Sequence, residues 1–222
     1  QALGQLGALN RAAFTQPVAA ITGSSGKTTV KEMLASIMRT RGAVLATKGN
    51  LNNELGVPLT LLELAPDYAA AVIELGASRI GEIAFTVSLT KPHVAVITNA
   101  GTAHVGEFGG PDKIVEAKGE ILEGLDHVGV AVLNKEDKAF PIWKARAGDR
   151  QVVSFAIADQ SADFHAQNLT RDARGCPGFT LCSPDGSAAV QLNLLGAHNV
   201  GNALAAAAAA HPRRAAALAA EA

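Results

Sequence analysis

The 222-residue chain lacks the features that mark several specialised classes of protein. It has two cysteines, Cys176 and Cys182, whereas a metal site built on thiolates normally needs four ligands, often in C-x-x-C pairs. We therefore expect two reduced thiols in a cytoplasmic protein. No apolar run is long enough to span a membrane, and we recognise no secretory signal at the start. The net charge is −1 without an extended basic block, so we expect no nucleic-acid partner.

Aromatic residues are also scarce, at 4% of a chain that is 48% hydrophobic, so small and aliphatic side chains must build the core. Short apolar runs alternate with helical patterns along the first two thirds, which predicts β-α-β units. The predicted strands cover residues 18–22, 43–47, 69–75, 94–98 and 128–133, and the predicted helices begin near residues 1, 27, 58, 80 and 112. In the first helix, over residues 1–15, we expect a buried stripe, formed by Leu3, Leu6, Leu9 and Ala13.

The pattern changes after residue 151. Short strands are predicted over residues 152–156, 164–169, 178–182 and 188–194, with turn signals at 174–175 and 184–186 and no long helix between them. This predicts a small antiparallel sheet over residues 152–195, appended to the main one, before a helix over residues 198–210. The fold class is therefore α/β: a three-layer, mostly parallel sheet with helices on both faces.

A glycine-rich turn, I-T-G-S-S-G-K-T-T, follows the first predicted strand at residues 21–29. The usual P-loop spacing, G-x-x-x-x-G-K-[ST], would require glycine at position 21, where Ile21 stands. A strand, a glycine turn and a helix nevertheless aim backbone N–H groups and the positive end of a helix dipole at phosphate. We predict a nucleotide site in which Lys27 reaches the outer phosphates and Thr28 binds magnesium through its hydroxyl.

Two further residues are candidates for metal or phosphate chemistry. Glu74 ends an apolar strand, at the sheet edge where open α/β folds bind ligands, although a surface glutamate is the alternative interpretation. His104 follows another strand in a glycine-containing loop and could bind metal through a neutral imidazole. The setting of Lys118, in E-A-K-G-E, is typical of a charged helix face. The histidines at positions 93, 127, 165 and 211 have no comparable setting, and we interpret them as solvated or structural.

The sequence N-K-E-D at residues 134–137 fits the N-K-x-D pattern by which small GTPases read guanine. An Asp-x-x-Gly also occurs, at residues 126–129, but it precedes the last parallel strand instead of following an earlier one. The short glycine turn also fails the GTPase spacing. We therefore weigh a GTPase-like nucleotide switch as the alternative and favour it less.

Several motifs occur together in an order that resembles the Mur ligases, ATP-dependent ligases of peptidoglycan precursor synthesis. These are T-G-S-S-G-K-T-T, G-N-L-N-N-E-L-G-V-P at 49–58, V-I-E-L-G-A at 72–77, H-V-G-E-F-G at 104–109, A-K-G-E-I at 117–121 and L-G-A-H-N-V-G-N-A-L-A-A-A at 195–207. The first two most resemble the branch of the family that adds D-alanyl-D-alanine. The resemblance covers residues 17–211.

The resemblance implies a reaction and its substrates. ATP would phosphorylate the terminal carboxylate of a UDP-N-acetylmuramoyl-tripeptide, and the amine of D-alanyl-D-alanine would attack the acyl phosphate. ATP and magnesium ions would be required, and we expect a monomer. Other Mur ligases and ligases of the folylpolyglutamate type remain same-class alternatives.

The resemblance also assigns roles to individual positions. The ATP phosphates would be held by Gly23, Ser24, Ser25, Gly26, Lys27, Thr28 and Thr29. Thr28 and Glu74 would share one magnesium ion, and His104 a second. Lys118 would be carbamylated, which turns a cation into an anion at the metal site and replaces the interpretation as a helix face. Asn199 and Asn202 would lie near adenine, and Asn52 and Asn53 near the muramoyl substrate.

The resemblance finally implies a domain organisation. Residues 17–211 would be the central ATP-binding domain, residues 1–16 the remnant of a connection from an N-terminal domain, and residues 212–222 the start of a connection to a C-terminal one. A chain of this kind would bind nucleotide weakly and would not ligate alone. A folded binding fragment without catalysis is therefore compatible with the ligase hypothesis.

Overall fold

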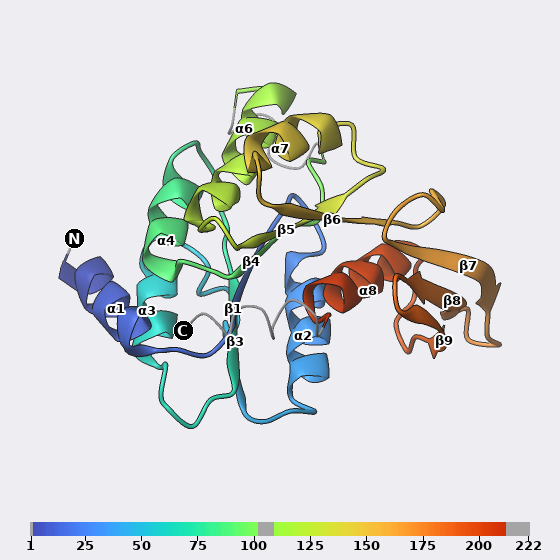
Figure 1. Ribbon diagram of the computed structural model, residues 1–222, viewed down its shortest axis with the longest axis horizontal. Helices are drawn as coiled ribbons and strands as arrows, with labels where there is room; N and C mark the ends of the chain where they lie inside the picture. The colour runs from blue at the N-terminus through green and yellow to red at the C-terminus, as the bar shows by residue number, and fades with distance from the viewer. Residues whose placement is uncertain (1, 102–108, 212–222) are drawn as a thin grey trace.

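The computed structural model describes residues 2–101 and 109–211. Within these residues a single nine-stranded sheet has the order β2-β3-β1-β4-β5-β6-β7-β8-β9. The strands are β1 (Val18–Thr22), β2 (Val44–Ala46), β3 (Ala70–Glu74), β4 (Val94–Ile97), β5 (Val130–Asn134), β6 (Gln151–Ala156), β7 (Phe164–Arg171), β8 (Pro177–Ser183) and β9 (Gly186–Gln191). Figure 1 shows the sheet crossing the molecule, with the last three strands projecting at one end.

The parallel part of the sheet puts β1 between β3 and β4. Ile21 pairs with Glu74 on β3, and Thr22 pairs with Ile97 on β4, so the three strands end at one edge. The chain passes from β1 to β2 at the edge of the sheet, returns to β3 between them, and then crosses to β4 on the other side of β1. This reversal is a topological switch point, where open α/β sheets bind ligands beyond the carboxyl ends of their strands.

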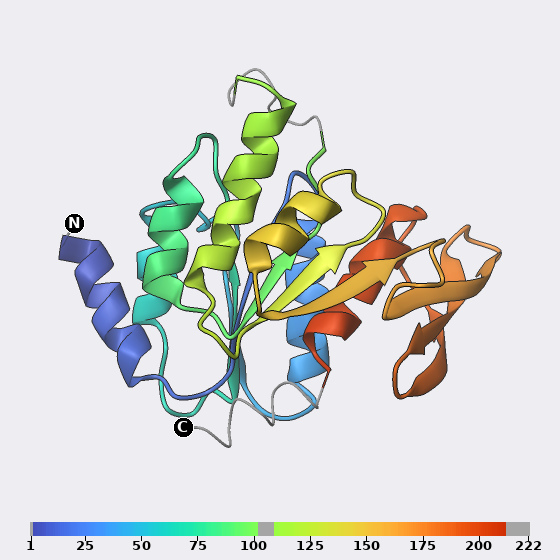
Figure 2. The same ribbon diagram turned by 45° about the horizontal axis from the view of Figure 1, so that its top comes forward.

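Helices cover both faces of the parallel strands, as Figures 1 and 2 show. One core cluster joins Ala20 of β1 to Leu61, Ile83 and Trp143 on the helices of one face, and the other joins Ile21 to Leu34 on the opposite face. The first face carries α3 (Gly56–Leu62), α4 (Glu82–Thr90), α6 (Pro111–Gly119), the 3₁₀ helix η1 (Glu120–Gly124) and α7 (Phe140–Ala147), with α1 (Ala2–Ala13) packed on α3 and α4; the second carries α2 (Lys27–Met38) and α8 (His198–Ala209). The expected three layers are confirmed.

The structure differs from the sequence-based expectation after residue 134. Helix α7, which the pattern did not predict, provides the crossover that brings β6 parallel to β5. Strand β7 also pairs in parallel with β6, through Phe155 with Phe164 and Ala156 with His165. The antiparallel part therefore comprises β7, β8 and β9 alone and continues the main sheet. Residues 152–156 belong to the parallel part, and the expectation of an antiparallel sheet beginning at residue 152 was wrong.

Helix α1 forms as predicted, but it buries a different face. Leu6 and Leu9 are 54% and 70% exposed, whereas Gly4, Gly7 and Arg11 are buried. A Cβ at Gly7 would lie 3.0 Å from the carbonyl oxygen of Pro58, so glycine permits close packing on α3. The Arg11 guanidinium donates to the carbonyl oxygens of Thr90, Phe14 and Lys91. Close backbone approach and these hydrogen bonds therefore decide the buried face of α1.

The structure bears on the expectations about the cysteines and about membrane-spanning segments. Cys176 and Cys182 are both free thiols, as predicted. None of the helices over residues 2–101 and 109–211 is long and apolar enough to cross a bilayer.

Candidate nucleotide and substrate site

The glycine turn between β1 and α2 depends on two backbone conformations that favour glycine. Gly23 has a φ of 148°, and a Cβ there would lie 1.9 Å from the Thr98 hydroxyl oxygen. Gly26 has a φ of 80°, in the left-handed region, and directly precedes the first residue of α2. The turn therefore curls tightly into the N-terminus of α2, which is the geometry of a phosphate cradle.

Two residues that the sequence did not single out hold this turn in place. Asn99 accepts hydrogen bonds from two backbone N–H groups of the turn: Ser24 to its carbonyl oxygen at 3.0 Å, and Ser25 to its Oδ1 at 3.1 Å. The Thr98 hydroxyl donates to the carbonyl oxygen of Ser25 at 2.6 Å. Their position in the sequence could have pointed to them, because both directly follow β4, the strand beside β1.

Helix α8 closes the other side of the turn. A Cβ at Gly26 would lie 2.4 Å from Asn202 Oδ1, so the Asn202 amide packs directly on the glycine turn. Asn202 donates to Asn199 Oδ1 at 2.9 Å, and Asn199 donates to the carbonyl oxygen of Leu195 at 2.8 Å. Asn202 therefore contacts the turn directly, while Asn199 holds the Asn202 amide in place.

Glu74 lies beside the start of α2, at the end of β3. The Thr28 hydroxyl donates to Glu74 Oε2 at 3.0 Å, and Glu74 is only 2% exposed. The buried Lys31 ammonium lies 3.9 Å from the same oxygen and donates to the carbonyl oxygen of Thr47 at 2.7 Å. These contacts offset the cost of burying the carboxylate. The alternative interpretation of Glu74 as a surface glutamate was wrong.

The Thr28 and Glu74 oxygens fit a magnesium ion by their chemistry. Mg²⁺ is typically held by one or two carboxylates together with substrate phosphates and water, so few protein ligands are needed. Among the described residues there is no group of three or more His, Cys, Asp or Glu side chains that could hold a metal by themselves. A site of this composition would therefore depend on a phosphorylated ligand. His104 lies outside the described residues.

Two lysines approach the same region. The Lys27 ammonium donates to the carbonyl oxygen of Gly23 at 2.8 Å, and burial lowers its pKa, partly opposed by the charge of Glu74. Burial also lowers the pKa of Lys118 to about 8, with the positive charge of Lys27 acting in the same direction. Lys118 is 3% exposed, so the interpretation as a charged helix face was wrong. An amine with this pKa has a larger neutral, nucleophilic fraction near neutral pH than an ordinary lysine does.

The segment that carries Lys118 is tied to the start of α4. Glu120 is 4% exposed, and its carboxylate accepts the backbone N–H groups of Gly81 at 2.7 Å and Ala84 at 2.9 Å. It supplies the N-terminal hydrogen bonds of a helix whose own N-cap residue, Gly81, has no side chain. This contact sets the position of Lys118 relative to the loop after β3.

Residues 49–55, which we call the asparagine loop, reach the same site. Asn52 donates through Nδ2 to Glu74 Oε1 at 2.8 Å. Asn53 points elsewhere, because its Oδ1 accepts the N–H groups of Leu55 at 3.2 Å and Gly56 at 2.8 Å, at the start of α3. The two adjacent asparagines therefore have different structural roles.

The glycine turn separates two cavities. One, of about 500 Å³, is lined by Ser25, Gly26 and Thr29 together with Asn99, Asn134 and Asn202. The other, of about 470 Å³, is lined by Gly23, Ser24 and Lys27 together with Asn52, Asn53 and Lys118. The structure thus brings most of the predicted residues to one turn, in two groups on its opposite sides.

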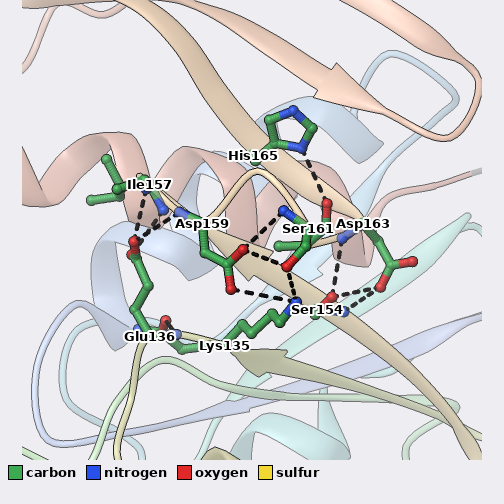
Figure 3. Close-up of polar contacts among 11 residues, drawn as sticks. Lys135, Glu136, Ser154, Ile157, Asp159, Ser161, Asp163 and His165 are labelled. Carbon is green, nitrogen blue, oxygen red and sulfur yellow. Dashed lines mark hydrogen bonds and ion pairs between the residues drawn. The ribbon is translucent and has the colours of Figure 1, made fainter.

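The N-K-E-D segment serves mainly to join neighbouring loops. Glu136 accepts the N–H groups of residues 157–159 at 2.7 to 3.2 Å, and Lys135 donates to the Ser161 hydroxyl, as Figure 3 shows. Asn134 donates to the carbonyl oxygen of Thr98, and Asp137 accepts the N–H group of Ala100 at 2.7 Å. Asp137 is therefore used to hold the loop after β4, which does not suit a guanine-reading role.

A parallel sheet with a glycine turn, a lysine and a threonine at its switch point defines a P-loop nucleotide-binding domain. Comparison with known proteins narrows this class. Residues 21–210 match the Mur ligase middle domain, and the chain belongs to this family. The short spacing of the turn is thus found in a member of a nucleotide-binding family.

Individual relatives agree with the family assignment. The chain is 48% identical over 207 residues to a UDP-N-acetylmuramoyl-tripeptide–D-alanyl-D-alanine ligase of Escherichia coli (strain K12), covering 93% of this chain and 46% of the relative. A crystal structure of MurF from Acinetobacter baumannii superposes with a TM-score of 0.89 at 46% identity, covering 93% of this chain and 45% of that one. A MurF ligase from Thermotoga maritima in complex with ADP gives 0.82 at 29% identity, covering 93% and 47%. The chain spans about half the length of the relatives it matches.

Proposed function

We propose that this chain is the ATP-binding part of a ligase that joins D-alanyl-D-alanine to UDP-N-acetylmuramoyl-tripeptide in peptidoglycan precursor synthesis. The name of the Escherichia coli relative supports the two substrates, and the ADP complex of the Thermotoga maritima relative supports an adenine nucleotide. The proposal includes a monomeric protein that works in the cytoplasm with ATP and Mg²⁺.

The observation that carries the proposal is the position of the glycine turn between two cavities. A nucleoside in the cavity beside Asn202 would direct its phosphates across the turn toward Lys27 and Lys118. An acceptor carboxylate in the second cavity, beside the asparagine loop, would meet the terminal phosphate there. Phosphoryl transfer depends mainly on such positioning and on neutralising charge.

Each residue of the site has a part in this reaction. Lys27 and the backbone N–H groups at the start of α2 would hold the outer phosphates. Thr28 and Glu74 would hold a Mg²⁺ ion, which supplies positive charge to the phosphates when bound. Lys118, once carbamylated, would present an anion in place of a buried cation. Asn199 would support Asn202 beside the nucleoside, and Asn53 would fix the start of α3 beside the substrate cavity. A second metal bound by His104 remains part of the proposal.

The proposal is tested by assaying phosphate release from ATP with the full-length protein that contains this chain. Release should require both UDP-N-acetylmuramoyl-tripeptide and D-alanyl-D-alanine, and single amino acids should replace the dipeptide poorly. Calorimetry should give tighter binding of ATP than of GTP, and the reverse order would favour a GTPase-like switch. The 222-residue chain alone should bind nucleotide weakly and release no phosphate in response to the dipeptide, and such release would contradict that part of the proposal.

A further inference from the structure

The carboxylate of Glu74 is held on both of its oxygens. Thr28 donates to Oε2 at 3.0 Å, and Asn52 donates to Oε1 at 2.8 Å. The Glu74 backbone N–H is also held, by the Thr47 hydroxyl at 2.9 Å. Thr28 belongs to the first turn of α2, Thr47 follows β2, and Asn52 lies in the asparagine loop, so three separate segments hold Glu74.

The backbone at Asn52 and at Gly76 accommodates the hydrogen bond between Asn52 and Glu74. The N–H group of Gly76 donates to the carbonyl oxygen of Asn52 at 2.8 Å, which fixes the loop against the segment that follows β3. A Cβ at Gly76 would lie 2.9 Å from Asn52 Oδ1 and 3.2 Å from Nδ2. Glycine at position 76 therefore leaves the space that the Asn52 amide occupies.

We propose that Asn52 is a positioning residue that holds the Glu74 carboxylate in the orientation required to bind Mg²⁺. The terminal torsion of a glutamate is soft, so a carboxylate without such a contact samples a broad range of rotations. Fixing Oε1 through Asn52 keeps Oε2 directed toward the Thr28 hydroxyl. Hydrogen bonds of this kind to a metal ligand orient it and tune metal affinity.

The inference changes the role expected of Asn52, from a contact with the muramoyl substrate to a link between the asparagine loop and the nucleotide site. It rests on the proposed function, because Glu74 must be a magnesium ligand for it to hold. Its consequence is that the magnesium requirement for ATP binding depends on Asn52 even when neither UDP-N-acetylmuramoyl-tripeptide nor D-alanyl-D-alanine is present. A residue that contacts only the substrate would have no such effect.

The test measures ATP binding to the full-length protein by calorimetry over a series of Mg²⁺ concentrations, and again in EDTA, without the other substrates. Asn52→Ala removes the contact, and Gly76→Ala displaces the same amide while keeping it in the chain. Each should raise the Mg²⁺ concentration that gives half-maximal binding by about tenfold, the typical effect of losing a partner of a metal ligand. ATP affinity in EDTA should not change.

Asn53→Ala is the matched control, because it removes the adjacent amide and loosens the start of α3 without touching Glu74. The inference is overturned if Asn52→Ala and Gly76→Ala keep the wild-type magnesium requirement. It is equally overturned if Asn53→Ala raises that requirement to the same extent, since the effect would then be a general loosening of the loop. Failure of the wild-type protein to bind ATP with Mg²⁺ would instead overturn the proposed function together with the inference.

Discussion

The side-chain oxygen of Asn202 on α8 lies where a side chain at Gly26 would have to be, 2.4 Å from an ideal Cβ position. A Cβ at position 26 would therefore require the Asn202 amide to move away from the glycine turn. Gly26 also has a left-handed backbone, with φ 80° and ψ −10°. The left-handed backbone and the contact with Asn202 therefore each favour glycine at position 26.

Gly26→Ala should lower the free energy of unfolding by more than the strain of a left-handed alanine alone, which costs about 1–2 kcal/mol. Gly81→Ala is the control, since Gly81 has a similar backbone, φ 91° and ψ −19°, with nothing within 4 Å of its Cβ position. Urea unfolding measures both variants. Gly26→Ala should also weaken ATP binding, and adding Asn202→Ala should reduce the difference in stability between the two glycine variants. Equal losses for the two variants would contradict the packing argument.

Glu74→Gln should weaken magnesium-dependent ATP binding by at least about tenfold, because glutamine keeps the shape of the side chain but lacks the charge that attracts the metal. Titration of ATP in the presence and absence of Mg²⁺ measures the effect. Glu32→Gln is a suitable control, since Glu32 also lies beside the Lys31 ammonium, at 3.1 Å, but is 58% exposed. A similar loss in both variants would mean that Lys31, and not the metal, explains the effect.

Lys118 should take up carbon dioxide, and the uptake should increase with pH. Its pKa of about 8, lowered from 10.5, means that about half of the amine is neutral and reactive at pH 8, and less at lower pH. Native mass spectrometry under carbon dioxide should detect the added mass, increasing between pH 7 and pH 9. Lys118→Met should abolish it, whereas Lys113→Met should retain it. Lys113 is exposed on the same helix, and its hydrogen bond to Glu116 raises its pKa. Uptake that persists in Lys118→Met would refute the assignment.

His93 should make the fold sensitive to acid. Its Nδ1 accepts the backbone N–H of Val18 at 2.9 Å, which requires an unprotonated nitrogen, and burial lowers its pKa below 6.5, with the charge of Arg11 adding to the effect. Well above pH 6.5 both the folded and unfolded states are neutral at this residue. As the pH falls below 6.5, the unfolded state binds a proton before the folded state does, so stability is lost.

Urea unfolding between pH 7 and pH 5 measures this dependence. His93→Asn offers an oxygen in place of Nδ1 and should lose less stability over that range than the wild-type protein. His127→Asn serves as the control, because His127 is exposed, and it should keep the wild-type dependence. Identical pH dependence in all three proteins would exclude His93 as its source.

The sequence-based predictions were correct where the interactions are local, and they failed where the interactions join residues far apart in the chain. The β1–turn–α2 unit was predicted correctly because residues 18–38 contain the apolar strand, the glycines and the helical stripe in one continuous segment. The buried face of α1 was not predicted correctly, because it depends on long-range contacts. Gly7 packs on Pro58, 51 residues away, and Arg11 donates to the carbonyl oxygen of Thr90, 79 residues away. The parallel pairing of β6 was missed because a short helix with little periodicity, α7, provides its crossover.

The parallel α/β sheet and the glycine turn before α2 could be predicted from the sequence, since both depend on local periodicity and on residues adjacent in the chain. The side chains that meet at that turn could be identified only from the folded chain. Thr28 and Glu74 are 46 residues apart, and they come together because the register pairs Ile21 with Glu74. Asn52 reaches the same carboxylate because glycine at position 76 leaves room for its amide. Strand order and close packing are properties of the folded chain as a whole, and no local pattern encodes them.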